Sequence, residues 1–188
     1  VNTNAEDYVA WNLKAGTTAV PSGGSITPTA CSFSATAGFG IYAHAGNSTS
    51  GATIAHGLGA TPAFMLTRRL NNTGGWAIYH HKNTAAPETD FLLLNSDAAT
   101  ADESSVWNDT APTSTLFTIG NDGTVNGAYN YVKYIWTEIQ GFSKFGSYTG
   151  NGNADGPFVY TGVRPAFIIL KNAGSVGFWY MYDTKRTP

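Results

Sequence analysis

Histidine is the residue type in this chain best suited to bind a metal ion or to transfer protons near neutral pH. The chain contains four histidines, His44, His56, His80 and His81. His80 and His81 are adjacent in a segment with the pattern of a strand, so their side chains should point to opposite faces and cannot bind one metal ion together. His56 lies in a turn-like His-Gly-Leu-Gly segment. We therefore expect structural or surface roles for the histidines, and no metal ion.

Catalytic carboxylates need a partner for proton transfer, and the acidic pairs of this chain lack one. Glu6-Asp7 and Asp102-Glu103 lie in polar, loop-like segments with no histidine or arginine at catalytic spacing. The Asn-Asp-Gly at residues 121–123 lacks the alternating ligands of a calcium loop. The signatures G-x-S-x-G, G-x-x-x-x-G-K-[ST] and H-E-x-x-H are absent from the sequence. We expect no catalytic residues, no cofactor and a non-enzymatic function.

Tyrosine and tryptophan combine an apolar ring with a polar edge, which suits them to stack on sugars or to form subunit interfaces. Tyr180 and Tyr182 share one face of an expected strand, because the side chains of a strand alternate. Loops at residues 71–75 and 98–108 are the expected sites of recognition, because loops on a rigid scaffold commonly carry contacts. The predicted surface contacts are Asn71, Asn72, Trp107, Asn108, Tyr180 and Tyr182.

The composition disfavours several classes of partner. The 188 residues include 10 Lys and Arg and 12 Asp and Glu, which gives a formal net charge of −2. This balance provides no basic surface for nucleic acid and no polybasic segment for anionic lipid. The sequence has no run of about 18 apolar residues, so we expect no membrane span. The single cysteine, Cys31, cannot form an internal disulfide, and stability must come from packing and strand pairing.

The sequence pattern is that of short strands joined by tight turns. Glycine occurs 22 times in 188 residues, and aromatic residues make up 13% of the chain. Only residues 98–105 have a pattern compatible with a helical turn. Because no β-α-β alternation is visible, we expect an all-β fold of antiparallel β-sandwich or jelly-roll-like domains. The expected strands lie at residues 39–43, 63–66, 76–79, 91–94, 114–119 and 129–135.

Two stretches of the chain resemble each other at a constant offset. The same distance of 103 residues separates Pro62 from Pro165 and Trp76 from Trp179. A period of this length is close to the size of one small β-sandwich, and it predicts domains in tandem instead of a solenoid. A tryptophan that recurs at the same point of each copy favours a place in the core, so we expect Trp76 and Trp179 to be core residues.

The repeat also predicts domain boundaries. Residues 8–11 resemble residues 131–134, which suggests that the chain is a segment of a longer one and begins with the end of an earlier copy. The expected organisation is the last strand of a preceding repeat at 1–16, a linker or long loop at 17–37, a complete β-sandwich repeat at 38–140 and the first half of a second repeat at 141–188.

Four stretches carry more specific patterns: YVAWNLKAG at residues 8–16, WNDTAPT at 107–113, GFSKFGSYTGNG at 141–152 and TGVRPAF at 161–167. They resemble a β-rich module that is repeated in tail-fibre-type proteins of phages, notably marine and cyanobacterial phages. The similarity spans nearly the whole chain. In the module a lysine follows the Pro-Ala-Phe strand; Lys171 retains it, whereas Arg68 and Arg69 stand at that point of the first copy.

The resemblance implies an extended virion appendage at the virion surface, outside the cell, built from tandem β domains. The expected partners are either other copies of the chain, in a homotrimer, or neighbouring virion proteins, and in addition a host surface glycan. We expect no nucleic acid and no membrane span. The family transfers no catalytic or ligand residues to this chain.

The sequence leaves three hypotheses of function open. The first is a structural and adhesive module of a phage tail fibre or a similar appendage. The second is a virion-associated glycan depolymerase, which needs two carboxylates about 5–10 Å apart across a cleft. The third is a capsid decoration or pure spacer. The carboxylates available to a depolymerase are Asp90, Asp97, Asp109 and Asp155.

Overall fold

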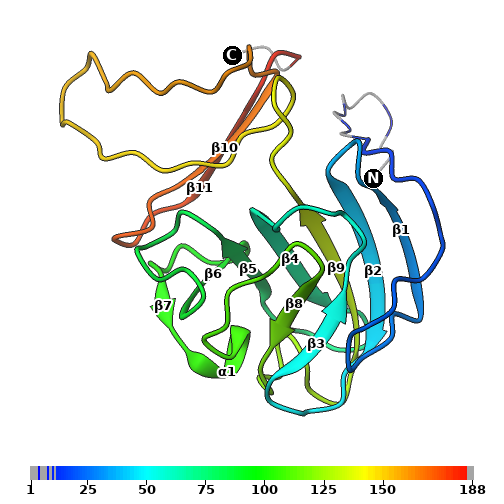
Figure 1. Cartoon of the computed structure of the whole chain (residues 1–188). Coiled ribbons are helices and arrows are strands. Elements are labelled where there is room, and N and C mark those ends of the chain that lie inside the picture. The colour runs from blue at the N-terminus through cyan, green and yellow to red at the C-terminus, as the bar shows by residue number, and fades with distance from the viewer. Residues whose placement is uncertain (1–3, 5–7, 9, 11, 186–188) are drawn as a thin grey trace.

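The computed structural model of the chain describes residues 4, 8, 10 and 12–185. Half of the segment 1–16, predicted to be the last strand of a preceding repeat, lies outside the described residues, and its described residues belong to no strand. The described part is nearly all β, as predicted, and none of its helices is long or apolar enough to cross a membrane. Its elements (Figure 1) are β1 Ala30–Ser34, β2 Phe39–Ala45, β3 Ala52–Ala55, β4 Phe64–Arg69, β5 Trp76–His80, β6 Asp90–Leu93, β7 Ala101–Asp102, α1 Ser104–Trp107, β8 Leu116–Ile119, β9 Asn130–Trp136, β10 Phe167–Lys171 and β11 Trp179–Asp183.

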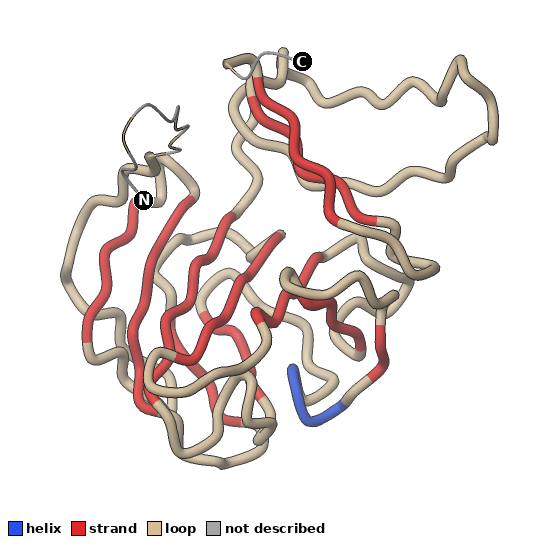
Figure 2. Tube along the Cα trace, turned by 180° about the vertical axis from the view of Figure 1, so that it is seen from behind, coloured by secondary structure: helices blue, strands red, loops and turns tan. Residues whose placement is uncertain are grey.

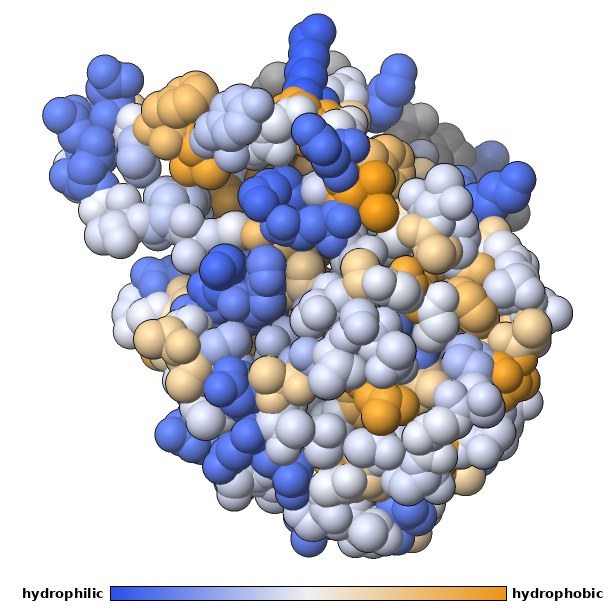
Figure 3. Space-filling view, in the orientation of Figure 1, coloured by the Kyte–Doolittle hydropathy of each residue, from blue (hydrophilic) through white to orange (hydrophobic). Residues whose placement is uncertain are grey.

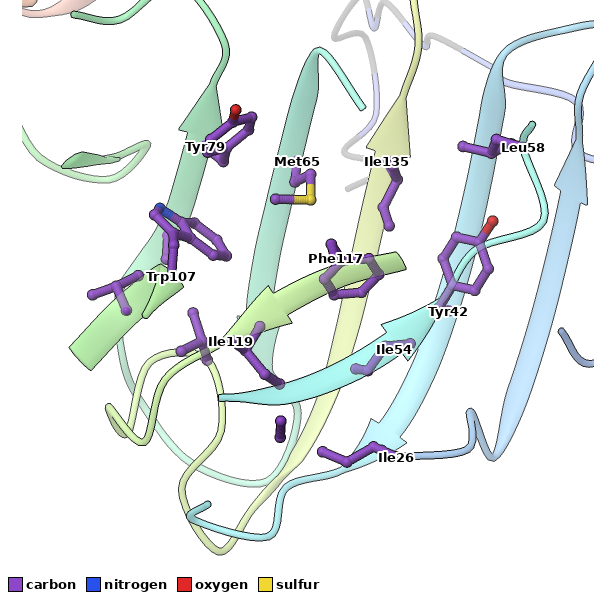
Figure 4. Packing of buried hydrophobic residues seen from close by; sticks show 14 of the residues in the cluster. Ile26, Tyr42, Ile54, Leu58, Met65, Tyr79, Trp107, Phe117, Ile119 and Ile135 are labelled. Atoms are coloured by element: carbon purple, nitrogen blue, oxygen red, sulfur yellow. The ribbon is translucent and has the colours of Figure 1, made fainter. Parts of the chain in front are cut away.

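Seven strands form one antiparallel sheet in the order β1-β2-β9-β4-β5-β6-β7. Strands β3 and β8 form a separate antiparallel pair, which lies across one face of the larger sheet (Figure 4). The side chains between these two layers form the hydrophobic core. Phe117 of the small pair belongs to the same buried cluster as Met65 and Ile135 of the larger sheet. Most of the core therefore lies within residues 38–140, the segment predicted to be a complete repeat, and Ile26 and Cys31 contribute to it from residues 17–37.

Strand β9 lies between β2 and β4 and has the clearest alternation of the sheet. Tyr131, Lys133 and Ile135 are buried, whereas the residues between them are only half-buried. Such a period of two places every second side chain on the same face. Lys133 therefore lies in the core, opposite Tyr42 of β2 and Thr67 of β4.

Residues 17–37 are not a linker throughout, so this prediction is partly wrong. Residues Ala30–Ser34 form β1, which pairs with β2 at the edge of the large sheet. Ile26 is buried, and its backbone nitrogen donates a hydrogen bond to Thr53 O at 2.9 Å. The alternation of Cys31 and Phe33 with small serines is the pattern that supports β1. The strands β3 and β7 were also not among the predicted strands.

The β10–β11 hairpin repeats the pairing of β4 with β5 residue for residue. Arg68 is paired with Trp76 in the first hairpin, and Lys171 is paired with Trp179 in the second. All five pairs of one hairpin differ from those of the other by the same 103 residues. Arg68, not Arg69, is therefore the counterpart of Lys171. Both tryptophans are half-buried, so the prediction that they are core residues is wrong.

The chain between β9 and β10 leaves the large sheet and makes a long excursion before the second hairpin (Figure 2). Near its start, the ring of Phe145 stacks on Phe64 at 5.7 Å between centroids, and Phe145 O accepts a hydrogen bond from His81 Nε2 at 3.0 Å. These contacts cover one end of the sheet face that points away from the core. They also fix where the excursion begins.

Asn126 is a fully buried polar residue that holds three segments together. Its Nδ2 donates to Thr49 O at 2.9 Å, to Gly120 O at 3.0 Å and to Asn47 Oδ1 at 3.1 Å. Its Oδ1 accepts from Asn47 N at 3.0 Å, and its backbone oxygen accepts from Ser48 N at 2.8 Å. A buried amide that is saturated in this way stabilises the loops that it joins.

Replacing Asn126 by alanine is expected to lower the free energy of unfolding by about 2–3 kcal/mol, because it leaves the buried Gly120 carbonyl and the part-buried Asn47 N–H without their partner. Urea unfolding measures the change. Asn121→Ala, at an exposed position a few residues earlier, is the control and should change stability by less than about 0.5 kcal/mol. Equal stability of the two variants would contradict the role given to Asn126.

Candidate functional site

The predicted surface contacts on the β4–β5 turn and on β11 are at the surface. Asn71 and Asn72 are exposed, and Asn71 Oδ1 accepts a hydrogen bond from Asn130 N at 3.0 Å, which fixes the turn to the start of β9. Tyr180 and Tyr182 are exposed on the same face of β11. These residues are therefore accessible to a partner.

Trp107 is a correction to the predicted contacts, because it lies in the core with only 1% of its surface exposed. Its ring meets Tyr79 edge to face at 6.0 Å between centroids. Asn108, the next residue, is half-buried and ends α1 in the left-handed region with φ of 58°. Its Oδ1 accepts a hydrogen bond from Ser50 Oγ at 2.7 Å. The 98–108 loop thus turns its tryptophan inward instead of presenting it to a partner.

The two buried histidines have structural surroundings. His56 accepts a hydrogen bond at Nδ1 from Leu58 N at 3.2 Å, so its Nε2 carries the proton and donates to Thr113 O at 3.2 Å. Burial lowers its pKa. His44 stacks on Tyr131 at 5.1 Å between ring centroids, and burial together with the charge of Lys133 lowers its pKa to about 3. Both rings are therefore neutral at physiological pH.

Lys133 is the most unusual polar group of the core. Its Nζ donates to Thr67 Oγ1 at 3.0 Å and lies over the rings of Phe117 at 5.6 Å and Trp107 at 5.9 Å. Among the described residues no carboxylate forms an ion pair with it. Burial lowers its pKa to about 7. Because the amine is enclosed in the core, its effect is on stability and not on a ligand at the surface.

An open hollow of about 540 Å³ lies between the chain that follows β6 and the start of β11. This volume is within the range of small-molecule sites. Figure 3, in the orientation of Figure 1, shows the arm that carries β10 and β11 projecting from the body. The hollow is lined by Leu94, Asn95, Ser96, Asp97, Phe178 and Trp179. We call it the junction hollow, because its two walls come from the chain after β6 and from the β10–β11 hairpin.

Hydrogen bonds fix the two walls of the junction hollow to each other. Trp179 Nε1 donates to Leu93 O at 2.9 Å, and Gly177 N donates to Asp97 O at 2.8 Å. Lys171 Nζ donates to the same Asp97 oxygen at 3.2 Å. These bonds explain why the tip of the second hairpin lies beside the segment after β6 in Figure 1. These hydrogen bonds therefore set the position of the two walls of the hollow relative to each other.

A second hollow, of about 330 Å³, has acidic residues in its wall, including Glu103 and Asp122. Glu103 Oε1 accepts from Ser105 N at 3.0 Å and from Ser105 Oγ at 2.8 Å, and these bonds lower its pKa. Asp122 Oδ1 accepts from both the backbone and the hydroxyl of Thr124. A catalytic acid in a glycosidase needs a raised pKa. Glu103 is therefore unsuited to that role.

Sequence reasoning placed no contact at the junction hollow, apart from naming Asp97 among the free carboxylates and Trp179 as an aromatic of interest. The two walls are about 80 residues apart in the chain, so no local motif joins them. The available signal was the run Phe178-Trp179-Tyr180 after a glycine, since three consecutive aromatic residues cannot all face one side of a strand.

Of three comparisons with known proteins, only the comparison with family models found a match. A family model described as a domain of unknown function (DUF7483) matches residues 1–188. No curated protein matches the chain. No solved structure matches it either.

Proposed function

The chain belongs to the family described as a domain of unknown function (DUF7483), and we propose that it is a structural and adhesive module of an extended virion appendage of the phage tail-fibre type. In this proposal the module is non-enzymatic and consists of β-sandwich or jelly-roll-like repeats in tandem. Residues 38–140, extended by β1, make one complete repeat, and residues 141–188 make the first half of another.

The observation that carries the proposal is the register of the two hairpins. Strands β10 and β11 pair as β4 and β5 do, with the basic residue opposite the tryptophan in both, at a constant offset of 103 residues. Unrelated hairpins have no reason to share register, turn position and side-chain types over five pairs. The shared register therefore supports the proposal that the chain contains two copies of one folded unit, one after the other.

The exposure of the second hairpin supports the same conclusion. Met65 and Tyr79 are buried in the first repeat, beneath β8 and α1, whereas their counterparts Ile168 and Tyr182 are exposed. An apolar strand face that the first copy buries and the second exposes is what half of a repeat should present. We therefore propose that the Ile168 and Tyr182 side chains are covered when the repeat is complete.

The hydrogen bonds that join the second hairpin to the chain after β6 support a structural role. The hydrogen bonds from Gly177 and Trp179 to the backbone after β6 prevent the second hairpin from swinging freely about the first repeat. A module that is connected to its neighbour in this way gives a stiff series instead of a flexible string. A glycan depolymerase is less well supported, because Asp90 is buried and bound to Thr84, and Glu103 is a helix cap.

A glycan array read beside an assay for reducing-sugar release tests the proposed function. We expect the purified chain to bind surface glycans of bacterial type and to release no reducing sugar. Release of sugar would show the depolymerase instead. If the chain neither binds glycans nor releases sugar, the adhesive part of the proposal is wrong, and a capsid decoration or spacer is favoured. Antibodies against the chain should in addition label an appendage of the virions that carry it, and light scattering should give the mass of a trimer.

A further inference from the structure

We infer that the junction hollow binds a neutral saccharide, with Phe178 as the stacking surface and Asn95, Ser96 and Asp97 as the polar contacts. This inference deepens the proposed adhesive function and rests on it.

Phe178 is an aromatic side chain that the fold does not require. It is 70% exposed at the start of β11, next to the anchored Trp179. Its counterpart in the first hairpin, 103 residues earlier, is Gly75. The same hairpin therefore folds with no side chain at that position. Because Phe178 also lines the junction hollow, its exposed ring is available to a ligand bound there.

The polar wall is held in place and retains hydrogen-bonding capacity. Asn95 Oδ1 accepts from Trp76 N at 2.9 Å, so the amide is oriented and its Nδ2 remains able to donate. Ser96 Oγ accepts from Ala98 N at 3.1 Å and still has its proton to donate. Within the described residues the Asp97 carboxylate makes no hydrogen bond or ion pair, although its backbone oxygen fixes the loop.

This combination of groups is complementary to a sugar ring. A pyranose has C–H groups on one face, which pack on an aromatic ring, and hydroxyls on its rim, which both donate and accept hydrogen bonds. An amide donor, a hydroxyl and a carboxylate acceptor from consecutive residues match such a rim. Lys171 Nζ, the nearby cation, is already bound to the backbone oxygens of Asp97 and Asn172. The uncompensated carboxylate disfavours phosphorylated or acidic sugars, so the ligand is neutral.

The test uses the full 188-residue chain and three single variants. Neutral oligosaccharides, namely maltohexaose, cellohexaose, chitohexaose and mannohexaose, together with the neutral glycans bound on the array, are titrated by saturation-transfer NMR. Phe178→Ala removes the stacking surface, and Asp97→Asn removes the charge but retains an acceptor. Phe158→Ala is the matched control, because Phe158 is 90% exposed and does not line the hollow. Circular dichroism and thermal melting check that each variant folds as the wild type does.

We expect Phe178→Ala to weaken binding at least about tenfold, which corresponds to the loss of one stacked ring. Asp97→Asn should weaken it severalfold, and Phe158→Ala should leave it within twofold. If the wild type binds a saccharide and both hollow variants bind it equally well, the junction hollow is not the binding site, whereas the adhesive function stands. If the wild type binds no saccharide in the titration or on the array, both the saccharide site in the hollow and the proposed adhesive function are wrong. Binding that is restricted to acidic sugars would also overturn the inferred ligand class.

Discussion

Replacing Trp107 by alanine is expected to lower the free energy of unfolding by about 3–5 kcal/mol, the range found when a fully buried aromatic side chain is removed from a core. Trp107 is 1% exposed, meets Tyr79 edge to face, and lies under the ammonium group of Lys133. Its deletion leaves a cavity between α1 and the large sheet that the neighbouring strands cannot close. Guanidinium unfolding followed by circular dichroism gives the change.

Two further variants separate packing from other effects of this change. Trp107→Phe retains a ring against Tyr79 and removes an indole N–H that has no hydrogen-bond partner within the described residues, so it should lose less than half as much stability. Tyr182→Ala, at the exposed position predicted for surface contact, should change stability by less than about 0.5 kcal/mol. A Trp107→Ala variant as stable as Tyr182→Ala would show that the tryptophan is a surface residue after all.

Replacing Lys133 by methionine is expected to stabilise the protein by about 1–4 kcal/mol near pH 6–7, because it removes an unpaired buried charge and retains most of the side-chain volume. Lys133 donates only to Thr67 Oγ1 and faces two aromatic rings. Those contacts favour the ammonium form but do not offset its desolvation, and the pKa falls from 10.5 to about 7. Lys82→Met, at an exposed position, is the matched control and should have little effect.

The same residue predicts how stability depends on pH. The pKa of Lys133 is about 7 in the folded state and near 10.5 in the unfolded chain, so the unfolded state binds more protons between these values. The stability of the wild type therefore rises with pH from about 7 upward, and below pH 7 the penalty is constant. His44, with its pKa of about 3, is neutral throughout this range. Urea unfolding at pH 6, 7 and 8.5 should show this rise in the wild type and a smaller one in Lys133→Met. Parallel curves would contradict the assignment.

The sequence predicted the strands whose apolar residues alternate over several positions. The predicted segments at 76–79 and 129–135 coincide closely with β5 and β9. Strand β3 was missed because its residues, Ala-Thr-Ile-Ala, have a single large apolar side chain, and its burial comes from the sheet beneath it. The charge of Lys133 suggests a surface position, but the alternation of its strand places it in the core. In this case the packing of the strand outweighs the preference of one side chain for water.

The site was less accessible to sequence reasoning than the fold. Trp107 was assigned to a contact surface because it lies in a polar loop, and only the packing of α1 against β8 and Tyr79 reveals that it is buried. The junction hollow depends on bonds such as that from Trp179 to Leu93 O, which join two distant parts of the chain. The repeat offset alone predicted which hairpin residues correspond. It could not predict how the second hairpin lies against the chain after β6.

Gly75 and Phe178 occupy equivalent positions of the two hairpins, and this difference bears on how the sequence of such a unit can change. The position lies outside the buried cluster and outside the strand register that both hairpins share. Phe178 is 70% exposed, so a substitution there changes the surface and leaves the core intact. A Cβ added at Gly75 would lie 2.7 Å from Leu93 Cδ2, so the first hairpin accepts a side chain at this point only if Leu93 moves. In the duplication that we propose, this position can therefore vary more freely in the second copy than in the first.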